Sequence, residues 1–211
     1  NVGRFIIKQV RFCIGIDDQL GQSISVKIPG SDIFPKIQIK ALGFDGQISC
    51  WGSTTWWNSA PPTTPSFKVT AGDEFSCALT EDFEAECWWG DTTVQFADPS
   101  GDWQQLDAGG KHMCGLRQNG SVECFGDDTY GQVSGVPAGV VFEQVSAGHR
   151  HSCGVELSTG SVHCWGRDNA GQVIGVPSGA FVTVDAGWSQ SRGARDNGTF
   201  ECWGCQGDNR G

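Results

Sequence analysis

Cysteine has the most reactive side chain in this 211-residue sequence, and its ten copies are regularly placed. Three pairs are separated by nine, nine and ten residues, the length of a short β-hairpin: Cys77 with Cys87, Cys114 with Cys124, and Cys153 with Cys164. Opposite positions on paired strands bring Cβ atoms within disulfide reach. The high cysteine content favours three disulfides in a secreted protein. The alternative is that these cysteines are small buried hydrophobic residues in a reduced protein.

The remaining cysteines and the histidines point to structure rather than catalysis. Cys202 and Cys205 form a C-x-x-C motif, a spacing found in redox and zinc sites. Because Cys202 also belongs to the cysteine repeat, we expect Cys205 to pair with one of the leftover cysteines, Cys13, Cys50 or Cys202. His112 and His151 share a repeat position, which predicts hydrogen bonds between repeats. Neither a nucleophile elbow nor an H-E-x-x-H motif occurs in the sequence. We therefore predict no catalytic residues, no metal site and no enzyme activity.

Tryptophan is the other residue type with functional potential. Four of the nine recur directly after a cysteine, at Trp51, Trp88, Trp165 and Trp203. Indole rings bind sugar faces and planar aromatic molecules, and they anchor protein interfaces. We predict a ligand site from the tryptophans outside the repeat and one nearby arginine: Trp56, Trp57, Trp89, Trp103, Trp188 and Arg192. The alternative is that these tryptophans fill packing gaps or seal a dimer interface.

The elements that must position these residues are repeated along the chain. Six cysteines recur every 37 to 40 residues, at Cys13, Cys50, Cys87, Cys124, Cys164 and Cys202. Asn119-Gly120 lies between two short strand patterns and is typical of a type I′ hairpin turn. No segment has a sustained helical period, so the chain is predicted to be all-β. We expect one domain over residues 1–211, with repeat units at 14–50, 51–87, 88–124, 125–164 and 165–202.

Short strands repeating at this period are typical of β-propeller blades. The segments 147–155 and 160–173 resemble the repeat of the regulator of chromosome condensation family. We predict about six short blades, five from full repeats and an incomplete one from residues 4–13, in a ring closed by the termini. The alternative is an open propeller that is completed by dimerisation through its exposed edge. The resemblance implies the fold more than the function, because propellers of this family include exchange factors, enzyme inhibitors and binding modules.

The charge and composition of the sequence exclude some classes of binding partner. The formal net charge of −10 argues against binding to nucleic acid. The sequence contains no run of about 18 apolar residues, so it predicts no membrane-spanning helix. The sequence begins at Asn1 without Met, which fits a processed secreted protein. We predict a non-enzymatic binder of a small planar aromatic molecule, such as a chromophore, or of a carbohydrate in the manner of a lectin. The alternative is a protein-interaction or inhibitor module that can form a homodimer.

Overall fold

The computed structural model describes residues 13–14, 38–42, 46–52, 61–73, 75–89 and 100–204. For residues 13–14, 38–42, 49–52 and 89 only the backbone is described. The described residues form five three-stranded sheets, which we call blades 1 to 5. No helix in this part of the chain is long and apolar enough to cross a membrane. The predicted all-β fold is therefore confirmed.

Each blade takes three consecutive strands of the chain. Blade 1 contains β1 (Cys13–Ile14), β2 (Gln38–Leu42) and β3 (Ile48–Gly52). Blade 2 contains β4 (Ser66–Ala71), β5 (Phe75–Thr80) and β6 (Ala85–Trp89). Blade 3 contains β7 (Trp103–Ala108), β8 (His112–Arg117) and β9 (Val122–Gly126). Blade 4 contains β10 (Phe142–Ala147), β11 (His151–Glu156) and β12 (Val162–Gly166). Blade 5 contains β13 (Thr183–Ala186), β14 (Ser191–Ala194) and β15 (Phe200–Trp203).

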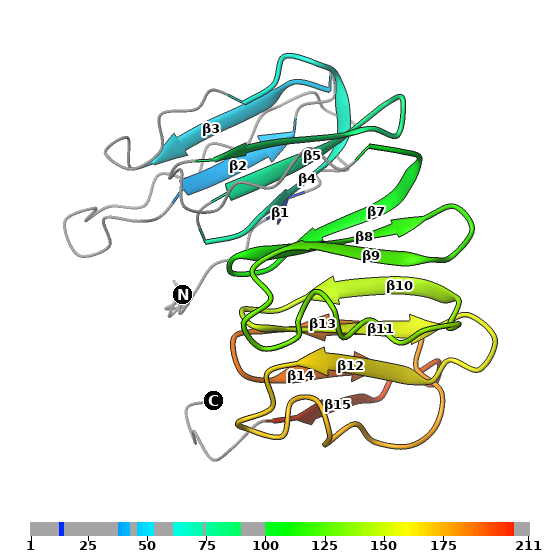
Figure 1. The fold of residues 1–211 in the computed structure, drawn as a ribbon. Coiled ribbons are helices and arrows are strands. Elements are labelled where there is room, and N and C mark those ends of the chain that lie inside the picture. Colours follow the sequence, from blue (N-terminus) through cyan, green and yellow to red (C-terminus); the bar gives the residue numbers. More distant parts are fainter. Residues whose placement is uncertain are drawn as a thin grey trace, which may run out of the picture.

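The blades are stacked in chain order and do not close into a ring. Figure 1 shows them running from β2 and β3 at the top to β15 at the bottom, so that blades 1 and 5 lie at opposite ends. Cys13, expected in a sixth blade, instead pairs in parallel with Lys40 of blade 1, and the neighbouring Ile14 pairs with Ala41. The described sheets thus correspond to the open propeller rather than to the closed six-bladed ring. The rest of the segment expected to form the sixth blade, residues 4–12, lies outside the described residues. The single domain over residues 1–211 and the dimerisation remain predictions.

The hairpin turns follow one backbone pattern even where the glycine is missing. Gly120, Gly160 and Gly198 have φ angles of 80°, 69° and 80°. Blade 2 has Phe83 at this place, and we expect from its sequence a different turn. Phe83 instead adopts a φ of 63° and donates its backbone N–H to Thr80 O over 3.0 Å, as Gly120 does to Arg117 O. A left-handed conformation at a bulky residue is uncommon and costs roughly 1 kcal/mol or more.

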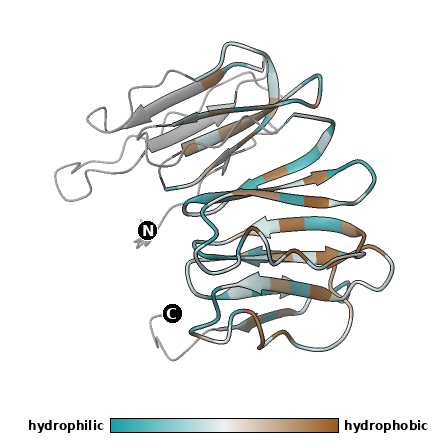
Figure 2. Cartoon of the chain, viewed as in Figure 1, coloured by the Kyte–Doolittle hydropathy of each residue, from teal (hydrophilic) through white to brown (hydrophobic). Residues whose placement is uncertain are grey.

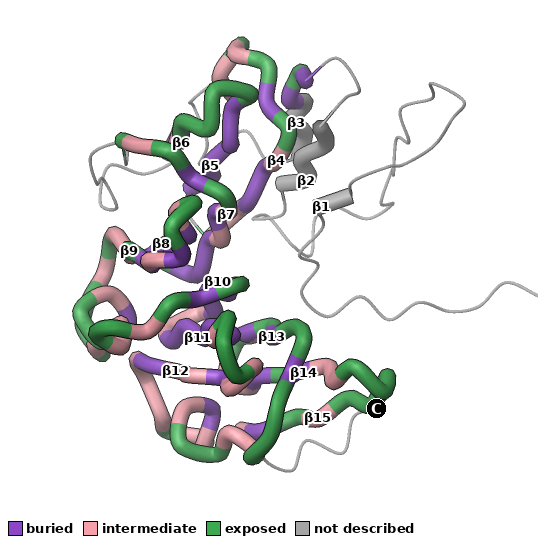
Figure 3. Tube along the Cα trace, turned by 90° about the vertical axis from the view of Figure 1, so that its right-hand side faces the viewer, coloured by how far each residue is buried: buried purple, intermediate pink, exposed green. Residues whose placement is uncertain are grey.

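In each of blades 3 to 5, a bulky aromatic ring packs against a glycine of the neighbouring strand. A Cβ atom at Gly115 would lie 2.4 Å from Trp103 Cε3, and one at Gly154 would lie 2.6 Å from Phe142 Cδ1. Gly193 and Phe181 repeat the arrangement in blade 5. The absent Cβ is what admits the ring, and this ring carries much of the buried apolar surface. Figure 2 shows the hydrophobic residues distributed along the strands of these blades, and Figure 3 shows buried segments running through the same strands.

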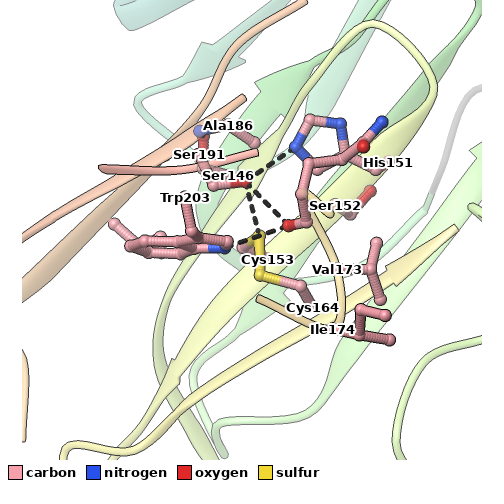
Figure 4. Close-up of a disulfide and its surroundings, with 12 residues drawn as sticks. Ser146, His151, Ser152, Cys153, Cys164, Val173, Ile174, Ala186, Ser191 and Trp203 are labelled. Atoms are coloured by element: carbon pink, nitrogen blue, oxygen red, sulfur yellow. Dashed lines mark hydrogen bonds between the residues drawn. A yellow bond between two sulfur atoms is a disulfide. The ribbon is translucent and has the colours of Figure 1, made fainter. Parts of the chain in front are cut away.

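Hydrogen bonds from buried side chains join successive blades. His112 Nε2 lies 2.8 Å from Ser152 Oγ, and His151 Nε2 lies 2.9 Å from Ser191 Oγ. All four residues are buried. Figure 4 shows the second junction, where Trp203 and the disulfide of blade 4 surround Ser191. The prediction that His112 and His151 have a structural role between repeats is confirmed.

Three predicted disulfides are present, one in each of blades 2 to 4. They are Cys77–Cys87, Cys114–Cys124 and Cys153–Cys164, with Cα separations of 4.0, 4.1 and 4.0 Å. Each pair occupies directly opposed positions on two antiparallel strands. The alternative of reduced cysteines is therefore overturned for these six residues. Cys202 is also disulfide-bonded. The predicted pairing of Cys205 lies outside the described residues.

Candidate interaction face on the propeller loops

The loops between the first and second strands of blades 2 to 5 form one continuous row. Each loop follows an Ala-Gly pair, and backbone hydrogen bonds connect it to the loop of the next blade. Asp73 N donates to Gly110 O over 3.0 Å, Gly110 N to Gly148 O over 3.2 Å, and His149 N to Gly187 O over 2.9 Å. The residues directly after the Ala-Gly pairs consequently stand side by side. We call this surface the loop face, and it consists of Asp73, Gly110, His149 and Trp188.

An acidic and an imidazole side chain meet across the glycine of this row. His149 Nε2 lies 3.2 Å from Asp73 Oδ2, although the two residues come from blades that are not neighbours. Gly110 stands between them, and a Cβ there would lie 2.6 Å from His149 Cδ2 and 3.2 Å from Asp73 Oδ2. The missing side chain of blade 3 therefore permits the contact between blades 2 and 4. The two side chains therefore lie within ion-pair distance of each other across the row.

The imidazole of His149 in turn supports an exposed indole. The rings of His149 and Trp188 are stacked, with centroids 3.5 Å apart and an interplanar angle of 8°. Trp188 keeps 51% of its surface exposed, while the side chain of His149 keeps only 14%. The indole is thus held in place from one side and open to solvent on the other. An aromatic ring that is ordered before binding loses little entropy on contact with a partner.

A shallow pocket of about 300 Å³ adjoins this row and shares His149 with it. Its lining residues are Lys111, Asp127, Thr129, Tyr130, His149 and Arg150, which we call the basic pocket. Arg150 Nη1 donates to Tyr130 Oη over 3.2 Å. The guanidinium carbons of Arg150 and Arg167 lie 5.4 and 5.0 Å from the centroid of the Tyr130 ring. Two arginines therefore flank one tyrosine on a chain whose net charge is −10.

The structure separates the residues of the predicted ligand site. Trp188 lies on the loop face, and Arg192 is exposed on β14 opposite Cys202. Trp103 is expected in the site as a tryptophan outside the repeat, and this prediction is corrected. Its side chain has no exposed surface, since Trp103 occupies the blade position of Phe142 and Phe181 and packs on Gly115. The side chain of Trp89, together with Trp56 and Trp57, lies outside the described residues.

Several residues of this face did not follow from the sequence as a site. Asp73, Gly110 and His149 occupy the same repeat position as Trp188. Alignment of the repeats could therefore have indicated that the four residues lie together. Tyr130, Arg150 and Arg167 lie in loops. Because arginines in loops are usually solvated, the sequence did not single them out as a site. The other two histidines of blade 4 lie apart from His149, with His151 at Ser191 and His163 at Glu156. Among the described residues, no group of three or more histidine, cysteine, aspartate or glutamate side chains is arranged to hold a metal ion.

Blades, junctions and loops together define an RCC1-like β-propeller. The family model of the regulator of chromosome condensation (RCC1) repeat matches residues 103–132 and 142–172, so this chain carries repeats of that family. These ranges contain blades 3 and 4 and the loops that follow them. A comparison with curated proteins gave no match.

Solved structures with the same fold include two plant receptor ectodomains. The ectodomain of the Physcomitrella patens receptor kinase CR4 is 30% identical, with a TM-score of 0.63 over 75% of this chain and 44% of that one. The CRINKLY WD40 ectodomain of the Arabidopsis thaliana receptor kinase ACR4 is 26% identical, with a TM-score of 0.61 over 76% and 57%. Yeast RCC1 (Prp20), solved with Kap60, is 15% identical with a TM-score of 0.63 over 80% and 54%, and it shows the fold alone. This chain spans about half the length of these structures.

Proposed function

We propose that this protein is an extracellular, non-catalytic interaction module that binds a protein partner through its loop face. Three disulfides support an oxidising compartment, because cytosolic thiols are kept reduced. The likeness to two receptor-kinase ectodomains supports the same location. The loops of a rigid scaffold are where functional residues concentrate, which supports recognition through the loop face.

The single observation that carries the proposal is the stacked pair of His149 and Trp188. Tryptophan is enriched at the energetic centres of protein interfaces, where it combines a large apolar area with few rotatable bonds. Here the indole is half exposed, and its orientation is fixed by the imidazole, which is itself held by Asp73. A partner that covers the open side of Trp188 would complete the burial of the ring.

A protein partner fits the described residues better than the small aromatic or carbohydrate ligand. That hypothesis depends on several tryptophans acting together, and Trp103, one of the two whose side chains are described, lies in the core. A shallow and polar pocket differs from the concave and mostly apolar sites that enclose small ligands. The proposal therefore treats Trp188 as the centre of a broader contact surface.

The test is selection of peptides from a displayed library on the folded protein, followed by affinity measurements by biolayer interferometry. We expect the selected peptides to bind Trp188→Ala about 30-fold more weakly than wild type, the loss of an interface centre worth about 2 kcal/mol. Phe200→Ala is the matched control, since Phe200 is 80% exposed but lies on β15 outside the loop face. Equal binding to wild type and Trp188→Ala would overturn the proposal, and so would an equal loss in both variants.

A further inference from the structure

We propose that the basic pocket takes a carboxylate side chain, so that the partner of the loop face contributes an acidic segment. This inference rests on the proposed function, because it assigns a chemical class to the partner of that surface. Its starting point is position: His149 belongs both to the loop face and to the wall of the pocket. A chain that covers Trp188 therefore passes next to the pocket.

The walls of the pocket are fixed to the propeller backbone. Asp127 N donates to Lys111 O over 2.8 Å, which connects the end of β9 to the loop before β8. Arg167 N donates to Arg150 O over 2.9 Å and makes the same connection in blade 4. The backbone of each arginine is thus held by a neighbouring loop of the blade. The guanidinium groups of Arg150, which lines the pocket, and of Arg167, which lies beside it, both form cation–π contacts with the lining residue Tyr130.

The hydrogen-bonding capacity of these arginines exceeds what the pocket uses. A guanidinium has five N–H donors, and the one side-chain hydrogen bond of Arg150 goes to Tyr130 Oη among the described residues. Within the described part of the chain, neither Arg150 nor Arg167 forms an ion pair with a carboxylate. The fork of an arginine matches a carboxylate in a bidentate geometry. The pocket therefore offers donors that an incoming anion can accept from.

The one acidic side chain of the pocket is occupied by neutral donors. Asp127 Oδ1 accepts from Thr129 Oγ1 over 2.5 Å, and Asp127 Oδ2 accepts from Gln132 Nε2 over 2.8 Å. Gln132 is buried, so this arrangement belongs to the loop structure. The Asp127 carboxylate is thereby turned toward its own loop, and Lys111 and Arg150 are the cationic residues of the pocket lining.

Size and net charge favour a single carboxylate on a protein over a long polyanion. A volume of about 300 Å³ accommodates one amino-acid side chain rather than a secondary-structure element. The formal net charge of −10 disfavours an extended polyanion such as a sulfated glycan. One glutamate or aspartate side chain would meet Lys111 and Arg150 of the pocket lining.

The probe is a ten-residue glycine peptide with one central Glu, compared with its neutral counterpart that has Gln at the same place. Binding is followed by ¹H–¹⁵N correlation spectra of the labelled protein. We expect the acidic peptide to shift the amide signals of Tyr130, Arg150 and Arg167, and the neutral peptide to leave them unchanged. The double variant Arg150→Gln/Arg167→Gln should bind the acidic peptide at least tenfold more weakly. Arg150→Lys keeps the charge but loses the fork, and we expect an intermediate loss.

The charge-matched control is Arg192→Gln, which removes one exposed arginine outside the pocket. It is compared with Arg150→Gln, so that both variants change the net charge equally. An equal loss of affinity in the two would mean general electrostatic attraction and would overturn the pocket. Tighter binding of a heparin oligosaccharide than of the acidic peptide through the same arginines would also overturn it. If the arginine variants keep the peptides selected above while Trp188→Ala loses them, the pocket is wrong and the proposed function stands.

Discussion

At the junction of blades 3 and 4, His112 contacts Ser152, and at the junction of blades 4 and 5 the same two positions hold His151 and Ser191. On the loop face, four equivalent positions hold four different residues, Asp73, Gly110, His149 and Trp188. Both regions are built on one repeat and connected by hydrogen bonds between blades. They differ in burial: the junction residues are inaccessible, while the loop face includes a half-exposed indole. At these two junctions the buried residues recur, whereas the residues on the loop face are individual.

The junction of blades 2 and 3 shows how a buried position changes. Phe75 stands where blades 3 and 4 have histidine, and Met113 stands where blades 2, 4 and 5 have serine. Both residues have no exposed surface and belong to one apolar cluster. A polar pair has thus been exchanged for an apolar pair on both sides of a junction. Replacing one member alone would leave a buried polar group without its partner, which costs roughly 1–3 kcal/mol.

The largest expected effect is that of Trp103→Ala, which tests whether this tryptophan belongs to the buried part of the comparison. Removing a fully buried indole should lower the free energy of unfolding by about 3–5 kcal/mol. Chemical denaturation followed by far-UV circular dichroism measures the change. A loss below about 1 kcal/mol would contradict the buried role of Trp103 and would support its place in the predicted ligand site.

The second prediction converts one junction into the other. His151→Phe alone should lower the free energy of unfolding by about 1–3 kcal/mol, because Ser191 Oγ loses a buried partner. Adding Ser191→Met recreates the Phe–Met pair of blades 2 and 3 and should recover part of the loss. The four unfolding free energies form a double-mutant cycle. A coupling energy of zero would show that the two positions do not act as a pair.

The cysteine spacing was enough to predict the fold, because one cysteine of each blade recurs every 37 to 40 residues along the sequence. In the strand register Lys40 is paired with Cys50 and Arg192 with Cys202, at the positions where blades 2 to 4 have two cysteines. The prediction that Trp103 lies in the ligand site was wrong because its position in the blade is aromatic in each of blades 3 to 5 but is not always tryptophan. Trp103 stands five residues before an Ala-Gly pair, as Phe142 does, and a search for identical residues does not detect this.

The loop face and its pocket were only partly accessible from the sequence. Trp188 stood out as a departure from the repeat, but its contact with His149 depends on hydrogen bonds between blades that no local pattern encodes. The contact of Asp73 with His149 depends on the absence of a side chain at Gly110. Arg150 and Arg167 both reach Tyr130, and a backbone hydrogen bond joins the two segments that carry them. Spatial neighbours that come from separate repeats are the part that spacing does not predict.

On the other side of the comparison, Trp188→Ala should have a small effect on folding. The variant loses one aromatic stack and the burial of half a side chain, which together contribute about 1 kcal/mol or somewhat more. Thermal and urea unfolding of Trp188→Ala beside Trp103→Ala measure the difference. A loss as large as that of Trp103→Ala would place Trp188 among the structural positions, and the loop face would then have no individual role.

The smallest expected effect concerns the hairpin ends, which are intermediate in exposure between junctions and loop face. In blade 3, Arg117 pairs with Glu123, while in blade 4 the acidic residue changes strand and Glu156 pairs with His163 over 3.1 Å. The hydrogen bond from His163, followed by those from Ser158 and Thr159, lowers the pKa of Glu156 below its ordinary value of 4.5. A carboxylate with a lowered pKa stabilises the fold above its unfolded pKa, and this contribution disappears as the pH falls through the folded pKa. Glu156→Gln should therefore lose less stability than wild type when urea unfolding is repeated below pH 4.5, with only a slight difference because ion pairs near the surface contribute little. Parallel pH curves for the two proteins would show that the swapped pair does not contribute, and that hairpin ends vary without consequence for the fold.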